Sequence, residues 1–294
     1  MIKDFERHKI DEYLNSQVVE INLLTHFYKG NCYDFTSLNE DYIWFSDLDD
    51  FNDPFEVVIQ DGDFDFKLLN QSQMVSFLMS NRFIELNDGK TSMIPAELDR
   101  KEVENIVDKN FMALSEPINK IVMRYVEYFK NNKFQCFSHD AKNKDIVKNR
   151  LMWSHYARGL RGFAVEFYFD PLLDSMSKLN HGFFSGYSLI NYTDLGFNDY
   201  IAEVIDMKKP LFVDRMIFSK HTDWEYEQEA RIMMKRNEGF YHPACISRII
   251  IGQKMEEINK EKIIEILDHK GMLDKLYIAR FDRKDFSINI EKYD

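Results

Sequence analysis

The feature that most constrains the fold is the run Phe-Ala-Val-Glu-Phe-Tyr-Phe at residues 163–169. In an extended strand, Phe163, Val165 and Phe167 point to one face, and the residues between them point to the other. Alternation of this kind is typical of a strand in a sheet. The run therefore predicts a strand, and it places one carboxylate, Glu166, among aromatic side chains.

Strand-like segments near both ends of the chain enclose a long helical stretch. Residues 21–28 and 41–46 are strand candidates near the start, and residues 248–252 form one near the end. From about residue 65 to 133, apolar residues recur three and four positions apart, as they do in amphipathic helices. We therefore expect one α+β domain over residues 1–294, with a mixed or antiparallel central sheet and a helical insertion at residues 65–133.

The acidic balance of the chain argues against some classes of partner. The sequence has 38 Lys and Arg residues against 50 Asp and Glu residues, a formal net charge of −12. This charge opposes broad binding to nucleic acid or to an anionic membrane. No stretch approaches the roughly 18 apolar residues of a membrane helix, and the first residues lack the apolar core of a signal peptide. We expect a cytoplasmic protein that makes no membrane contact.

The cysteines do not follow the spacing of a metal site or of a disulfide framework. Cys32, Cys136 and Cys245 are odd in number, far apart and without a CxxC pair. We expect three small, buried side chains in a reducing compartment.

The segment Trp153-Ser154-His155-Tyr156 sets two polar residues between two large aromatic residues. Two interpretations stay open. In the first, Trp153 and Tyr156 belong to the core, and Ser154 and His155 bond to nearby backbone groups. In the second, the same four side chains contact a ligand or take part in catalysis.

A second polar segment follows Lys220 and runs from Trp224 to Arg231. On a strand, Glu227, Glu229 and Arg231 would share one face. They form either an ion-paired, solvated face or a site in which one Glu binds a ribose hydroxyl or stabilises developing positive charge.

Two further groups have a structural interpretation beside a functional one. Asn52-Asp53-Pro54 is a turn-forming sequence, but Asp50, Asp53 and Glu56 together are also the type of carboxylate cluster that binds Mg²⁺ or Ca²⁺. His26 is the one ionisable residue in an apolar strand, where a core histidine is the favoured interpretation.

Several short motifs together resemble a bacterial family, domain-of-unknown-function family 2971. They are, in chain order, Thr25-His26-Phe27-Tyr28, Ile43-Trp44-Phe45-Ser46, Asn52-Asp53-Pro54-Phe55, Cys136-Phe137-Ser138, Met152 to Ala157, Gly162-Phe163, Lys220 with Trp224, Tyr226, Glu227, Glu229 and Arg231, and Ile250-Ile251-Gly252. The resemblance implies a bacterial or phage-encoded protein of the kind often found near mobile-element or defence genes. It implies no particular chemistry.

The order of three shorter motifs is also similar to that of ADP-ribosyltransferases. These motifs are His26, Trp44-Phe45-Ser46 and Glu227-Gln228-Glu229. The similarity implies that the first two hold a nicotinamide riboside, and that the last Glu stabilises an oxocarbenium-like state through a ribose hydroxyl.

These interpretations lead to one principal hypothesis and two alternatives. We expect an effector-type enzyme that acts on a small-molecule nucleotide, with NAD⁺ as the expected substrate, no tightly bound cofactor and no metal. The expected catalytic residues are Glu229, Glu227 and His155. The expected ligand-binding residues are His26, Trp44, Asn52, Asp53, Trp153, Ser154, Tyr156, Lys220, Trp224 and Arg231. The alternatives are a metal-dependent nuclease that uses Asp50, Asp53, Glu56 and Glu227, and a non-enzymatic module that binds a ligand or a protein partner.

Overall fold

A computed structural model describes residues 20–51, 70–81, 83–85, 91–93, 97–140, 145–194 and 217–293. The chain separates into two compact units. The helical unit comprises the described parts of residues 48–131 and 191–222. The sheet unit comprises those of residues 11–47, 132–190 and 223–294. The single domain expected over residues 1–294 stays a prediction.

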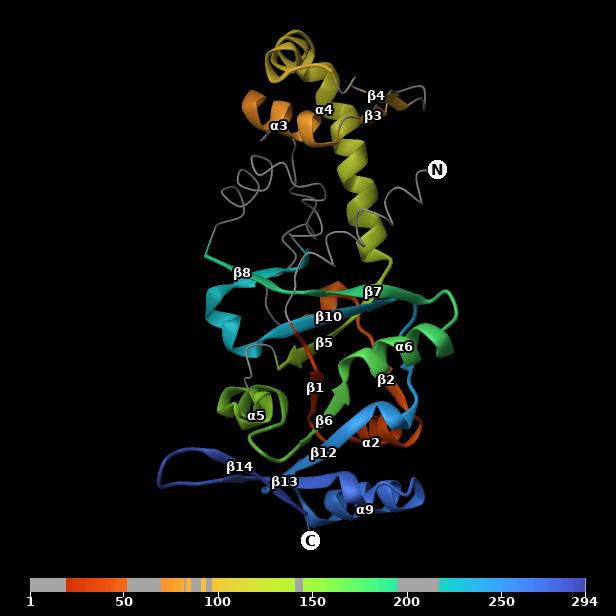
Figure 1. The fold of residues 1–294 in the computed structure, drawn as a ribbon, viewed down its shortest axis with the longest axis vertical. Helices are drawn as coiled ribbons and strands as arrows, with labels where there is room; N and C mark the ends of the chain where they lie inside the picture. The colour runs from red at the N-terminus through yellow and green to blue at the C-terminus, as the bar shows by residue number, and fades with distance from the viewer. Residues whose placement is uncertain are drawn as a thin grey trace. The chain divides into compact units, whose positions relative to one another are not determined.

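The sheet unit is built on an eight-stranded sheet in the order β14-β13-β12-β6-β1-β5-β10-β7 (Figure 1). Its strands are β1 (Leu23–Tyr28), β5 (Lys133–His139), β6 (Phe163–Tyr168), β7 (Phe184–Leu189), β10 (Glu229–Met234), β12 (Ile246–Gly252), β13 (Leu276–Phe281) and β14 (Ile288–Lys292). Neighbouring strands are antiparallel except for β12 and β13, which are parallel. The sheet is therefore mixed, and the predicted α+β class is confirmed.

Helices cover both faces of this sheet. The helices of the unit are α2 (Cys32–Asn39), α5 (Arg150–Tyr156), α6 (Phe169–Leu179) and α9 (Glu257–His269). Residues of α2, α6 and α9 belong to a large core cluster, whereas residues of α5 belong to a smaller one. The unit also holds the 3-10 helices η4 (Ile146–Lys148) and η6 (Pro243–Cys245), and the two-stranded ribbon of β2 (Tyr42–Trp44) and β11 (Glu238–Phe240). A further 3-10 helix, η5 (Thr222–Glu227), leads into β10.

Strand β6 shows the alternation that its sequence predicts. Phe163, Val165 and Phe167 lie in the large core cluster, and Ala164 lies in the small one. Both faces of the strand are therefore buried. Glu166 shares the face of Ala164, which is the face that α5 covers.

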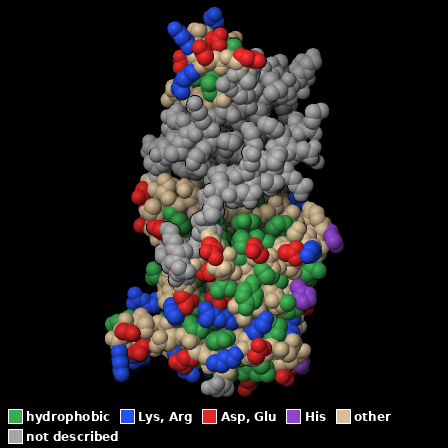
Figure 2. Space-filling model, in the orientation of Figure 1, with side chains coloured by type: hydrophobic (Ala, Val, Ile, Leu, Met, Phe, Trp, Pro, Cys, Tyr) green, Lys and Arg blue, Asp and Glu red, His purple; other side chains and the backbone are tan. Residues whose placement is uncertain are grey.

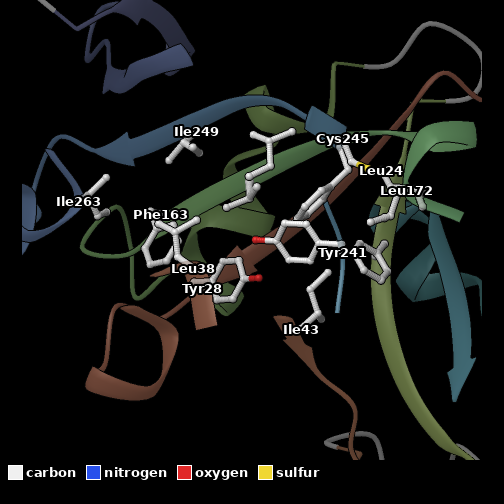
Figure 3. Packing of buried hydrophobic residues seen from close by; sticks show 14 of the residues in the cluster. Leu24, Tyr28, Leu38, Ile43, Phe163, Leu172, Tyr241, Cys245, Ile249 and Ile263 are labelled. Carbon is white, nitrogen blue, oxygen red and sulfur yellow. The ribbon is translucent and has the colours of Figure 1, made fainter. Parts of the chain in front are cut away.

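The large core cluster contains two buried tyrosines (Figure 3). Tyr28 stacks on Phe163 with ring centroids 4.6 Å apart. The hydroxyl of Tyr28 and that of Tyr241 point toward one another from opposite sides of the cluster. Burial raises the pKa of both phenols, so each stays protonated.

The helical unit contains α3 (Gln71–Asn81) and α4 (Arg100–Lys130), which fall within the predicted helical segment. A hairpin of β3 (Phe83–Glu85) and β4 (Thr91–Met93) lies between them in the chain. The helix α4 is interrupted at Asn110, whose φ of −131° and ψ of 17° are not helical. The unit also includes η1 (Leu48–Asp50) and the parallel pair of β8 (Asn191–Thr193) and β9 (Ser219–His221).

The surface of the sheet unit carries charges of both signs. In the view of Figure 2, Lys and Arg side chains alternate with Asp and Glu side chains over the part that holds β13, β14 and α9. The ion pairs Arg280–Glu291 and Lys260–Glu257 lie in these elements. Within the described ranges, no helix combines the length and the apolar character needed to cross a bilayer.

Candidate functional site

Side chains at both ends of α5 bond to η5. At the start of α5, the Nδ2 of Asn149 donates to the carbonyl of Tyr226 at 2.9 Å. At its end, the Nδ1 of His155 lies 2.9 Å from the hydroxyl of Tyr226, and the hydroxyl of Tyr156 donates to Glu227. Two consecutive residues of α5 thus contact two consecutive residues of η5, and these contacts fix the position of the Glu227 carboxylate.

The other two residues of the Trp-Ser-His-Tyr segment take different places. Trp153 is 1% exposed, its Nε1 donates to the carbonyl of Val147 at 2.6 Å, and its ring meets that of Phe27 edge-on at 5.3 Å. Trp153 is therefore part of the small core cluster, as the structural interpretation expected. Ser154 is exposed on the helix surface.

Glu227 and Glu229 lie on either side of a backbone reversal. The sequence predicts one strand for both residues, but Glu227 ends η5 and Glu229 begins β10. Gln228 between them has a φ of 46°, in the left-handed region that residues with a side chain rarely occupy. Its backbone N–H and its side-chain Nε2 both donate to the carbonyl of Glu225, at 3.2 and 2.5 Å. Its carbonyl accepts a hydrogen bond from the N–H of His139 at 2.8 Å.

Both carboxylates are buried, and each has its own partner. Glu227 is 3% exposed and accepts from Tyr156, whereas Glu229 is 2% exposed and accepts from the Nε of Arg231 at 2.6 Å. Arg231 is itself fully buried. The phenol of Tyr156 is thus one donor to Glu227, and the guanidinium of Arg231 is one donor to Glu229, where its charge favours the ionised carboxylate.

His26 lies on the opposite face of the sheet from Glu229. Its ring contacts Tyr28 at 4.4 Å and Phe137 at 5.6 Å, and both of those residues belong to the large core cluster. Ala230, the residue after Glu229, also belongs to that cluster, so Glu229 points away from it. The structure therefore does not bring His26 together with the carboxylates.

The environment of His26 is that of a core histidine. Its Nδ1 lies 3.1 Å from the carbonyl of Cys136 and 3.0 Å from the Nε2 of Gln135. Burial lowers the pKa of His26 to about 4, and the hydrogen bond to Cys136 partly opposes this shift. The ring fills the space beyond Thr25, where β1 and β5 no longer pair.

The remaining predicted ligand residues lie in three different elements. Trp44 lies in β2 opposite Glu238 and is 51% exposed. Trp224 is half-buried in η5, with its ring 6.1 Å from that of Tyr226. Lys220 is buried in β9, which belongs to the helical unit.

The residues of the metal hypothesis are only partly described. Asn52, Asp53 and Glu56 lie outside the described residues, and Asp50 is exposed in η1. In the part of the chain that the structure describes, no group of three or more His, Cys, Asp or Glu side chains is arranged to hold a metal ion. The nuclease alternative stays a prediction.

Two contributors to the site, Asn149 and Gln228, were not predicted from the sequence. Asn149 is the N-cap of α5, because its Oδ1 accepts from the N–H of Leu151 at 2.9 Å. An Asn before a helical segment is a recognisable cap signal. Nothing in the local sequence predicts the left-handed backbone of Gln228, which is held by the carbonyl of Glu225, three residues before it, and by the N–H of the distant His139.

A comparison with known families finds one match, over residues 152–232. This segment is similar to the model of a family described as a protein of unknown function, DUF2971. The matched span begins in α5 and ends in β10, so it contains Tyr156, Glu227, Glu229 and Arg231. Neither the curated proteins nor the solved structures contain a match to the chain.

Proposed function

We propose that this protein is an enzyme that breaks the N-glycosidic bond of a ribonucleotide, with NAD⁺ as substrate and water or a second molecule as the ribosyl acceptor. The observation that carries the proposal is the pair of buried carboxylates around Gln228, one held by a phenol and the other by a guanidinium. Two carboxylates in different environments are suited to two different roles in one reaction.

Glu229 is the group that stabilises positive charge. When the bond between C1′ and the nicotinamide nitrogen breaks, its electron pair leaves with the nicotinamide, and the ribosyl group becomes oxocarbenium-like. An ionised carboxylate that is already fixed in place stabilises this charge without reorganising. The bond from Arg231 keeps Glu229 ionised and fixes its orientation.

Glu227 accepts the proton of the attacking water. The water oxygen bonds to C1′, its proton passes to the carboxylate, and the products are ADP-ribose, nicotinamide and one proton. The hydroxyl of Tyr156 donates to Glu227 and holds the carboxylate in position for this transfer. His155, the exposed neighbour of Tyr156, contacts the hydroxyl of Tyr226, the residue before Glu227.

The similarity to ADP-ribosyltransferases supports this proposal only through its last motif. Glu227-Gln228-Glu229 carries both carboxylates, whereas His26 packs into the opposite face of the sheet. Depletion of NAD⁺ would halt growth of the host cell, which fits an effector role in phage defence.

Incubation of the purified protein with NAD⁺, followed by mass spectrometry for nicotinamide and ADP-ribose, tests the proposal. We expect turnover by the wild-type protein and a loss of about 100-fold or more in Glu229→Gln, the scale on which preorganised electrostatic groups contribute. Gln keeps an acceptor for Arg231, so its melting temperature should stay near that of the wild type.

The matched control is Glu225→Gln. Glu225 is an exposed residue of η5, and its carboxylate is replaced in the same way, so turnover should be unchanged. Full activity in Glu229→Gln would remove the assigned role. Binding of NAD⁺ without release of nicotinamide would favour the non-enzymatic alternative.

A further inference from the structure

One residue from each of five adjacent strands forms a polar row across the sheet. In order from β12 to β10, the paired residues are Arg248, Glu166, Thr25, Ser138 and Glu229. Directly paired residues of antiparallel strands have their side chains on the same face, with Cβ atoms about 5 Å apart. We call these five residues the polar row.

The inner part of the polar row is buried, although its members are polar. Glu166, Thr25, Ser138 and Glu229 are each 2 to 3% exposed. On the same face, the next residues along β1, β6 and β12 are apolar members of the small core cluster: Phe27, Ala164 and Ile250. Burying polar groups costs free energy unless they are hydrogen-bonded, so a purely structural sheet would favour apolar residues here as well.

Each carboxylate of the polar row is matched by a guanidinium. Arg248 donates to both oxygens of Glu166, and Arg231 donates to Glu229. Burial raises the pKa of Glu166, and the hydrogen bond and charge of Arg248 oppose that shift. Arg248 also lies 3.6 Å from a carboxylate oxygen of Asp145, so its positive charge is shared between two carboxylates.

The residues between the two pairs are hydroxyl-bearing. Thr25 and Ser138 each offer one donor and two acceptor positions, the complement of another hydroxyl group. The two hydroxyls lie between the Arg248–Glu166 and Arg231–Glu229 pairs, and this part of the polar row is therefore suited to a hydroxylated group.

At Ser138 and Glu229, the polar row lies close to the ends of the strands. Glu229 is the first residue of β10, and Ser138 is the last but one of β5. Connecting segments at strand ends are where ligands usually gain access. From Glu166 to Glu229 the row spans three strand spacings, about 14 Å, so it extends well beyond the carboxylates of the proposed site.

We infer that Thr25 and Ser138 form a hydroxyl-binding subsite that receives the ribose of the ligand whose glycosidic bond is broken at Glu229. This inference rests on the proposed function. It makes the two residues determinants of specificity for a ribosyl group.

ADP-ribose and ADP test this subsite, because the two compounds differ only in the terminal ribose. By isothermal titration calorimetry, we expect the wild-type protein to bind ADP-ribose more tightly than ADP. Ser138→Ala should weaken the binding of ADP-ribose by about 10-fold, the loss of roughly one hydrogen bond, and leave that of ADP unchanged. Thr25→Val, which keeps the shape of the side chain, should act in the same direction.

Ser175→Ala is the matched control. Ser175 is a buried serine of α6, and its Oγ accepts from the N–H of His242 at 2.7 Å, outside the polar row. This variant should melt at a lower temperature but bind both compounds as the wild type does. Thermal melting of every variant identifies any that fails to fold. The binding affinities of the folded variants for ADP-ribose and ADP then test the subsite.

The possible outcomes separate the two proposals. If the wild type prefers ADP-ribose and the folded variants of the polar row keep that preference, the subsite is overturned and the proposed function stands. Equal weakening for ADP-ribose and ADP would also overturn the subsite. A wild-type protein that binds neither compound would overturn both.

Discussion

The Nε of Arg231 donates to the Oε1 of Glu229 at 2.6 Å, and both side chains are withdrawn from solvent. The two residues are two positions apart in β10, so the strand places them on the same face. In such an environment each charge is tolerated only because the other is present. The same contact therefore serves the proposed chemistry and the stability of the sheet.

Removal of the guanidinium alone should destabilise the protein strongly. Arg231→Met leaves Glu229 buried without its cation, and we expect a loss of about 3–5 kcal/mol in the free energy of unfolding, measured by urea denaturation. The double variant Arg231→Met with Glu229→Leu should recover most of that loss, because no unpaired charge remains. The control is Lys178→Met in the exposed pair Lys178–Asp174, which should change stability by less than about 1 kcal/mol. If Arg231→Met were as stable as the wild type, the energetic coupling between Arg231 and Glu229 would be contradicted.

The left-handed backbone at Gln228 predicts that a glycine at this position is more stabilising than a β-branched residue. Gln228→Gly and Gln228→Val both lose the side-chain amide that donates to Glu225. The difference in stability between the two variants therefore reports on the positive φ at this position. Gly adopts a positive φ freely, whereas a β-branched side chain does not. We expect the Val variant to be less stable than the Gly variant by about 1–2 kcal/mol in urea denaturation. If the Gly and Val variants were equally stable, the folded protein would not require a positive φ at residue 228.

The hydrogen bond from Tyr156 to Glu227 should matter for turnover more than for folding. Tyr156→Phe removes only the hydroxyl, and we expect kcat/KM for nicotinamide release to fall about 10-fold, the scale of one hydrogen bond to a charged group. Tyr168→Phe, which removes a half-exposed phenol of β6, serves as the control and should leave kcat/KM unchanged. Unaltered kinetics in Tyr156→Phe would exclude a positioning role for this hydroxyl.

The partly buried ring of His26, whose pKa is lowered by desolvation, predicts a stability that depends on pH. Its pKa is lowered from 6.5 to about 4, so the unfolded chain binds a proton in that interval and the folded protein does not. The free energy of unfolding should therefore fall as the pH falls from 6.5 toward 4, by at most about 1.4 kcal/mol per pH unit. Urea denaturation across this range should show a shallower dependence in His26→Gln. His269→Gln, at an exposed position in α9, should keep the wild-type dependence; identical slopes in all three proteins would refute the prediction.

Local sequence patterns predicted the strands and helices in which apolar side chains recur with a regular period. The alternation of Phe163, Val165 and Phe167 appears in the structure as a strand buried on both faces, because side chains of a strand alternate whatever surrounds it. The amphipathic helices expected within residues 65–133 are present as α3 and α4 for the same reason.

The sequence also predicted that the segment from Glu227 to Arg231 forms part of a site. It did not predict the backbone geometry of that segment. Glu229 and Arg231 share a face as predicted, since they lie in one strand. Glu227 does not continue that strand, because Gln228 is held in a left-handed conformation by the carbonyl of Glu225 and the N–H of His139. The contact with His139 depends on the pairing of β5 with β10, which the residues around Gln228 do not specify.

By itself, the sequence determined that residues 163–169 begin as a strand, that helices lie within residues 65–133, and which residues share a face within such regular segments. Only the tertiary structure decided that His26 and Glu229 lie on opposite faces of the sheet, and that Glu166, Thr25, Ser138 and Glu229 meet in one row. The physical reason is that periodicity fixes the direction of a side chain relative to its own strand. The order and register of the strands, by contrast, follow from pairing between segments far apart in the chain.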